Sequence, residues 1–142
     1  MLKKKSVLER ISVTIEQDLL EAFDRSVTEQ GYATRSEAVN ALIREALIKK
    51  EIARPEAQAA GAVVLVYNHH ERQLSGRLTD RQHETHHHVI ATMHVHLDHD
   101  NCLEIIALRG KAAEIRRVAD ELISLKGVKH GRFIETAAGK YF

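Results

Sequence analysis

Apolar and polar residues alternate strictly over residues 9–16, a period of two that predicts a strand with one apolar face. The apolar face consists of Ile11, Val13 and Ile15, and the polar face of Arg10, Ser12 and Thr14. Apolar residues then recur at helical spacing over about 17–30 and about 35–50, with Gly31 placed to cap the first helix. The first fifty residues therefore predict one strand followed by two helices.

The second helix begins with a capping-box pattern, in which Thr34 caps the helix and Glu37 reaches back toward it. Beyond this helix, the chain is rich in alanine and contains its only proline, Pro55, which favours a linker. The expected division is a first domain over 1–50, a linker over 51–60 and a second domain over 61–142.

The second half of the chain alternates between strand and helix patterns. The expected strands are 61–67, 88–97, 102–109 and 128–136, and the expected helices are 71–82 and 111–125. Their order, βαββαβ, is that of a ferredoxin-like fold. The whole chain is therefore expected to be an α+β protein.

Composition narrows the class of protein further. A chain of 142 residues suits one domain or two small ones, and its net charge of +1 neither favours nor opposes a nucleic-acid partner. The single cysteine, Cys102, cannot form an intramolecular disulfide, which suits a reducing compartment. The longest apolar run, about 62–67, is far too short to span a bilayer. We therefore expect a soluble, cytoplasmic protein without a membrane partner.

Histidines and the cysteine are spaced as metal ligands would be. His94 and His96 would stand on one face of a strand, and the polar, turn-forming residues 97–101 would let Cys102 begin the return strand opposite them. Two imidazoles and a thiolate then converge as most of a metal site, with His83 or a neighbour available as a fourth ligand. The alternative is that these histidines are packed or solvated residues without a metal.

The N-terminal unit has the features of a DNA reader. Fifty residues in a single βαα unit are too few to bury their own apolar faces, so the strand is expected to pair with that of a second copy. The resulting ribbon would present Arg10, Ser12 and Thr14 to the major groove, and Lys3, Lys4 and Lys5 to phosphates. The alternative is that the polar residues form the wet face of an edge strand.

These patterns resemble a known family. The first fifty residues look like a ribbon-helix-helix repressor domain, and the chain from about Arg10 to Phe142 resembles the nickel-responsive regulators of the NikR family. The resemblance rests on residues 10–15, 31–38 and 94–104. It implies a ribbon-helix-helix (βαα) domain joined to a ferredoxin-like domain of the ACT type, assembled into a homotetramer as a dimer of dimers.

The resemblance also implies which residues act. Nickel, Ni(2+), would be held by His94, His96 and Cys102 of one chain and by His83 of a neighbouring chain. The DNA-reading residues would be Arg10, Ser12 and Thr14. An acid near Glu37 serves a secondary cation site in the family, but the position one turn later is Ala41 here. A loop that approaches DNA in relatives corresponds here to Glu71 and Arg72. A second, weaker metal site could use His86, His87 and His88, or these histidines could bind no metal.

The expected function is that of a nickel-dependent transcriptional repressor, not an enzyme, which binds an inverted-repeat operator and limits nickel uptake. Two alternatives stay open. The ACT-like domain could sense a small molecule such as an amino acid, the histidines being incidental. His94 and His96 could instead serve a metal-dependent hydrolase, which would need an open coordination position and a base.

Overall fold

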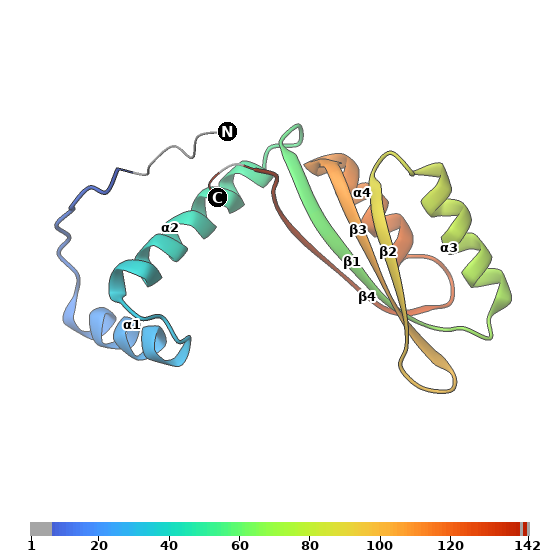
Figure 1. The fold of residues 1–142 in the computed structure, drawn as a ribbon, viewed down its shortest axis with the longest axis horizontal. Coiled ribbons are helices and arrows are strands. Elements are labelled where there is room, and N and C mark those ends of the chain that lie inside the picture. Colours follow the sequence, from blue (N-terminus) through green and yellow to red (C-terminus); the bar gives the residue numbers. More distant parts are fainter. Residues whose placement is uncertain (1–6, 140, 142) are drawn as a thin grey trace. The chain divides into compact units, whose positions relative to one another are not determined.

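The computed structural model describes residues 7–139 and 141, and it divides into two compact units, one reaching to Leu42 and one beginning at Ile43 (Figure 1). The helices are α1 (Gln17–Glu29), α2 (Arg35–Ile52), α3 (Arg72–Glu84) and α4 (Ala112–Ile123). The strands are β1 (Gln58–Asn68), β2 (Val89–His96), β3 (Asn101–Lys111) and β4 (Val128–Ala137). Within the described residues, no helix is both long and apolar enough to cross a membrane.

The N-terminal unit differs from expectation at its start. Residues 7–16 form no strand in this single chain, although the alternating pattern predicts one over 9–16. The apolar side chains of that segment are exposed, Ile11 at 73% and Val13 at 65%. A strand needs a hydrogen-bonding neighbour, and the described part of the chain pairs no strand with this segment.

The turn between the first two helices follows the expected chemistry. Gly31 ends α1 at φ +74°, and Tyr32 N–H donates to the Val27 carbonyl at 3.1 Å, as in a Schellman cap. Thr34 Oγ1 accepts the Glu37 N–H at 3.2 Å, and the Glu37 carboxylate accepts the Ala33 N–H at 3.1 Å. The predicted capping box is therefore present, with its return bond made one residue earlier than in the usual form.

The stretch expected as a linker is shorter in the structure. Helix α2 continues to Ile52, and β1 begins at Gln58, which pairs with Lys111. Only residues 53–57 lie between the two elements. The early start of β1 follows from pairing, because every residue of β1, from Gln58 to Asn68, lies opposite a residue of the long strand β3.

The C-terminal unit has the expected βαββαβ order. Its four strands form one antiparallel sheet in the order β2-β3-β1-β4. Helices α3 and α4 bury their apolar sides against one face of this sheet, where Leu74, Leu78, Ile115 and Leu122 are fully covered. The other face leaves Met93, Val95 and Ile134 exposed. The core therefore lies between the sheet and its two helices.

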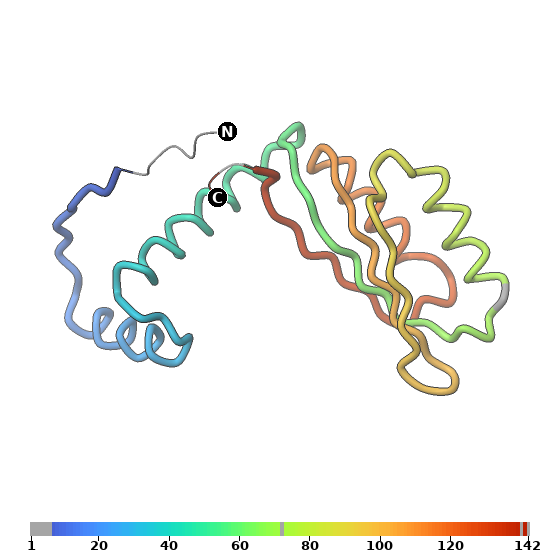
Figure 2. Tube along the Cα trace, in the orientation of Figure 1, coloured from blue at the N-terminus to red at the C-terminus, as the bar shows by residue number. Residues whose placement is uncertain are grey.

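Two loops come together at one end of this sheet. The hairpin between β2 and β3 and the turn between β1 and α3 lie beside one another in the chain trace (Figure 2). The His69 N–H donates to the Asp100 carbonyl at 3.1 Å, which ties the turn to the hairpin. The candidate metal ligands are found at this end.

Candidate metal centre

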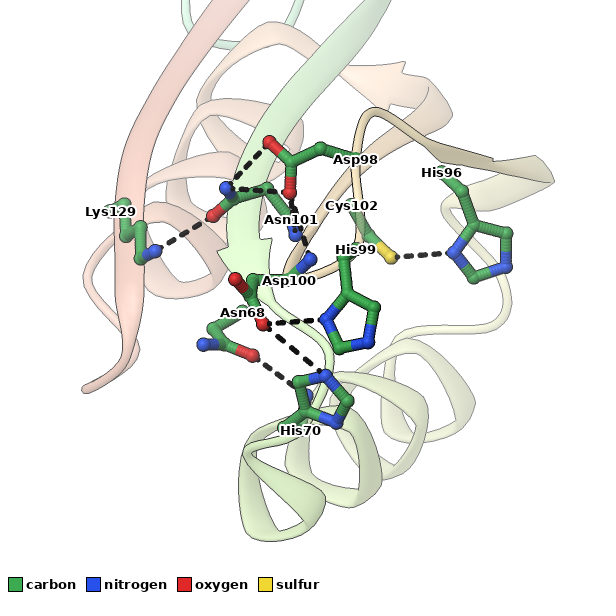
Figure 3. A network of polar contacts seen from close by, with 9 residues as sticks. All are labelled: Asn68, His70, His96, Asp98, His99, Asp100, Asn101, Cys102 and Lys129. Carbon is green, nitrogen blue, oxygen red and sulfur yellow. Dashed lines mark hydrogen bonds and ion pairs between the residues drawn. The ribbon is translucent and has the colours of Figure 1, made fainter.

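The register between β2 and β3 sets the centre. His96 lies opposite Cys102 and His94 opposite Glu104, so all four side chains stand on the face that α3 and α4 cover. The Cys102 Sγ is 3.2 Å from the His96 Nδ1 (Figure 3), and the rings of His94 and His96 are 5.1 Å apart. The structure thus brings His96 and Cys102 together, whereas His94, on the same face, is not among the donor groups of the described residues that lie within 4.8 Å of one another.

A buried hydrogen-bond network orients His94. Tyr67 donates its hydroxyl proton to Glu104 Oε2 at 2.6 Å, and the same hydroxyl oxygen lies 3.3 Å from His94 Nδ1. Because the hydroxyl has a single proton, His94 Nδ1–H must be the donor of the second bond. The lone pair of His94 then resides on Nε2, which leaves that nitrogen free to bind a metal.

Tyr67 and Glu104 form a fixed pair behind the histidines. Burial, together with the Glu104 carboxylate, raises the pKa of Tyr67 well above its ordinary value, so its hydroxyl keeps its proton. The second oxygen of Glu104 accepts a hydrogen bond from Gln82 Nε2 at 2.6 Å. Both oxygens of this buried carboxylate are therefore engaged.

Cys102 is fully buried, and burial raises the pKa of its thiol, an effect that nearby Asp98 and Glu104 strengthen. In the absence of a metal the side chain is therefore a thiol at neutral pH. A divalent cation would have to displace this proton, because the thiolate is the form that binds metal.

His69 is a ligand candidate that the sequence reasoning missed. Donor atoms of His69, His96 and Cys102 all lie within 4.8 Å of one another, and the rings of His69 and His96 are 5.6 Å apart. Among the described residues, His69 Nδ1 is a buried side-chain nitrogen without a hydrogen-bond partner. The signal was available, because His69 lies two residues after the end of the strand predicted over 61–67.

Other histidines lie elsewhere. His83 is exposed near the end of α3 and, within the part of the chain that the structure describes, does not join the His96–Cys102 group. His86 and His87 are exposed in the following turn. His88 is buried, with its Nδ1 3.3 Å from the Arg109 carbonyl oxygen and its Nε2 3.8 Å from Glu114. His88 therefore already has protein partners.

The donor set fits a borderline or soft first-row cation. Imidazole nitrogens and one thiolate suit nickel, copper and zinc, whereas magnesium and calcium prefer oxygen ligands. The buried, unpartnered His69 Nδ1 beside the thiol is a second sign that a cation belongs here, because buried polar atoms without a partner are costly. The residues present thus fit a metal of the nickel class.

Residues expected to contact DNA lie in the N-terminal unit. Arg10, Ser12 and Thr14 are all exposed in the segment before α1. Lys3, Lys4 and Lys5 lie outside the described residues. The Glu37 carboxylate is used by the capping bond to Ala33, and Glu71 precedes the first residue of α3.

Comparison with known proteins covers both units. Residues 9–50 match the family model of ribbon-helix-helix proteins of the CopG family, and residues 60–136 match the model of the NikR C-terminal nickel-binding domain. A nickel-responsive regulator of Solibacter usitatus is 53% identical over 134 residues, covering 94% of this chain and 96% of the relative. Such a match extends through both units of the chain.

Other relatives are similar over nearly the same length. A nickel-responsive regulator of Geobacter sp. strain M21 is 49% identical and covers 92% of this chain and 94% of the relative. One of Pyrococcus abyssi is 47% identical, with coverage of 94% and 96%. Among solved structures, the C-terminal domain of the MgtC protein from Mycobacterium tuberculosis is 15% identical, with a TM-score of 0.42. The match covers 63% of this chain and 96% of that domain. The chain belongs to the family of nickel-responsive regulators, with a ribbon-helix-helix segment ahead of an ACT-like α+β domain.

Proposed function

We propose that this protein is a nickel-dependent, DNA-binding transcriptional regulator that acts as a repressor of nickel uptake. Family membership supports the regulator class. The observation that carries the nickel site is the convergence of Cys102 Sγ and His96 Nδ1 at 3.2 Å, with His94 on the same face. We assign His94, His96 and Cys102 of one chain and His83 of a neighbouring chain as the ligands.

Bound nickel would supply a cross-link between chains, since one proposed ligand belongs to a neighbouring chain. Other residues of the chain orient the proposed ligands. Tyr67 and Glu104 fix the tautomer of His94, and outer-sphere bonds of this kind commonly orient metal-binding histidines. The thiol of Cys102 loses its proton on binding, which makes nickel affinity depend on pH.

A homotetramer, built as a dimer of dimers, is the proposed assembly. The face of the sheet that no helix covers exposes apolar side chains, Met93 at 54% and Ile134 at 71%. Exposed apolar patches of this kind mark sites of contact with another protein. The exposed apolar side chains before α1 favour pairing with a second copy there. Two separate apolar faces support two kinds of contact between copies.

DNA recognition is proposed for the paired N-terminal segments. A two-stranded antiparallel ribbon fits the major groove, and Arg10, Ser12 and Thr14 would read base edges from it. Because the ribbon has two-fold symmetry, the operator is an inverted repeat. The cytoplasm, where this DNA resides in a bacterium or archaeon, is the proposed location.

The two alternatives are less well supported. A hydrolase needs a free base near its metal, and the buried carboxylate beside the histidines, Glu104, has both oxygens engaged by Tyr67 and Gln82. A sensor of small molecules would leave the convergence of Cys102, His96 and His69 without a purpose. Binding of nickel to the full chain separates these functions.

The direct test follows nickel binding by absorption. Nickel-loaded protein should show a sulfur-to-nickel charge-transfer band, and Cys102→Ala should abolish it. His94→Ala should weaken nickel binding strongly, whereas His130→Ala, which removes an exposed histidine of β4, should leave it unchanged. A band that persists without Cys102 would refute the thiolate ligand. If His69→Ala weakens binding and His94→Ala does not, the ligand set is His69, His96 and Cys102.

The ligand from a neighbouring chain has a separate test. A metal that binds only the assembled state stabilises it, so nickel should raise the melting temperature of the parent protein. His83→Ala should reduce that rise. His87→Ala, which removes an exposed histidine from the turn that follows α3, is the matched control. An undiminished rise in His83→Ala would place the whole site within one chain.

A further inference from the structure

The two strands that carry the proposed ligands end together at the metal centre. His96, the last residue of β2, lies opposite Cys102 in the final pair between β2 and β3. At this end β3 is also paired with β1, through Asn101 opposite Asn68, whereas β2 is an edge strand of the described sheet. Among the described residues, the backbone of His96 is therefore held by β3 and by the turn that follows it. The end of an edge strand opens more readily than the middle of a sheet.

One carboxylate closes that turn. Asp98 Oδ1 accepts the backbone N–H groups of Asp100 at 2.8 Å and Asn101 at 2.7 Å. The side-chain amide of Asn101 donates to both Asp98 oxygens, at 3.0 Å to Oδ1 and at 2.8 Å to Oδ2. The Leu97 N–H donates to the Asn101 carbonyl at 2.9 Å. Asp98 thus binds the residue that directly precedes the cysteine ligand.

Lys129 ties the same turn to the far side of the sheet (Figure 3). It is the second residue of β4, which lies on the other side of β1 from β3. Its Nζ donates to Asn101 Oδ1 at 2.7 Å, so both ends of the Asn101 amide are engaged. None of these bonds uses the Cys102 sulfur or a His96 ring nitrogen. A bound metal would therefore leave them intact.

We propose that Asp98 and Asn101 are positioning residues of the nickel site, which hold His96 opposite Cys102 before a metal arrives, and that Lys129 anchors them. This role rests on the proposed nickel site. Donors that are already in place spare the metal the entropic cost of ordering the turn. Without Asp98, the Cys102 sulfur and His96 Nδ1, which are 3.2 Å apart here, would sample wider separations. Nickel affinity would then fall although every ligand is still present.

Competition titrations of the full, metal-free chain with Ni(II), followed by the sulfur-to-nickel charge-transfer band, test the proposal. Asp98→Ala should weaken nickel binding by at least about tenfold, the lower end of the range for groups that orient metal ligands. At saturation the band should keep its parental position, because the ligands are unchanged. Lys129→Ala leaves the turn residues intact and should also weaken binding. Lys126→Ala, which removes an exposed lysine just before β4, is the matched control and should bind as the parent does.

A reciprocal exchange separates positioning from general stability. Asn101→Asp sets a second carboxylate against Asp98, and the repulsion should weaken nickel binding. Combined with Asp98→Asn, it restores one amide facing one carboxylate, and the amide oxygen at position 98 still accepts the two backbone N–H groups. The double variant should therefore recover most of the lost affinity.

The melting temperature of each metal-free variant is measured alongside nickel affinity. A lower melting temperature with parental affinity in Asp98→Ala and Lys129→Ala would show a merely structural role and overturn the proposal. A double variant that binds no better than Asn101→Asp would overturn it as well. If Asp98→Ala does not fold, Lys129→Ala and the double variant decide the result. A parent protein without the charge-transfer band would overturn the nickel site itself, and this role with it.

Discussion

The two units of this chain differ in how much of their apolar surface they bury within a single chain. In the C-terminal unit, side chains such as Leu65, Ile106 and Ile115 are fully buried between the sheet and its helices. In the N-terminal unit, Ile11 and Leu19 are more than half exposed. Both units have regular apolar patterns in sequence, so the difference lies in what the chain supplies for those patterns to pack against.

Strand pairing explains the difference. β3 pairs with a strand on each side, and its inward side chains pack against α3 and α4. Residues 9–16 have the same alternation but no paired strand among the residues that the structure describes. A period of two therefore gives a strand only where a partner exists, and in the N-terminal unit that partner is proposed to be a second copy.

The largest effect expected concerns the C-terminal core. Ile115→Ala should lower the free energy of unfolding of this unit by about 2–5 kcal/mol, because a fully buried side chain leaves a cavity. Leu42→Ala, at a position 55% exposed in the N-terminal unit, should change the same transition by no more than about 0.5 kcal/mol. Denaturant unfolding measures both. Equal losses would mean that the two units unfold as one.

DNA binding should depend on the N-terminal unit alone. Arg10→Ala should cost about 1–3 kcal/mol in operator affinity and relax the preference at one base in each half-site. Arg117→Ala, which removes an exposed arginine of α4, is the matched control and should bind as the parent does. Gel-shift titration with nickel present measures the affinities. If Arg10→Ala binds with parental affinity and selectivity, the ribbon is not the reader.

Nickel affinity should depend on pH through the C-terminal unit. Burial raises the pKa of Cys102, so the metal-free thiol is protonated below its raised pKa and each nickel displaces one proton. Affinity should therefore rise about tenfold per pH unit through neutral pH, and it should fall as pH drops. Competition titrations between pH 7 and 8.5 measure the slope. A flat profile would exclude displacement of a thiol proton.

The smallest effect expected concerns the turn of the N-terminal unit. Thr34→Ala removes the acceptor of the Glu37 N–H and should cost about 1 kcal/mol in stability. Ser36→Ala, in the same turn of α2 but outside the cap, should have little effect. Thermal unfolding followed by circular dichroism compares the two. Loss of stability in Ser36→Ala alone would show that Thr34 is not the effective cap.

Local patterns in the sequence determined most of the architecture. The helical spacing, the turn at Gly31 and the cap at Thr34 act between residues close in the chain, and the structure has all three. The βαββαβ order follows for the same reason. The pairing of His96 with Cys102 was also accessible, because the short hairpin between them leaves few registers.

Only the tertiary structure decided what lies beyond these local patterns. Sequence spacing could not bring His69 to Cys102, since their contact depends on the register of β1 against β3. It could not bring His70 to Asp100, because these residues come from loops joined through the sheet. The strand predicted over 9–16 is absent for the same physical reason, because hydrogen bonds between distant segments form only where the fold places a partner.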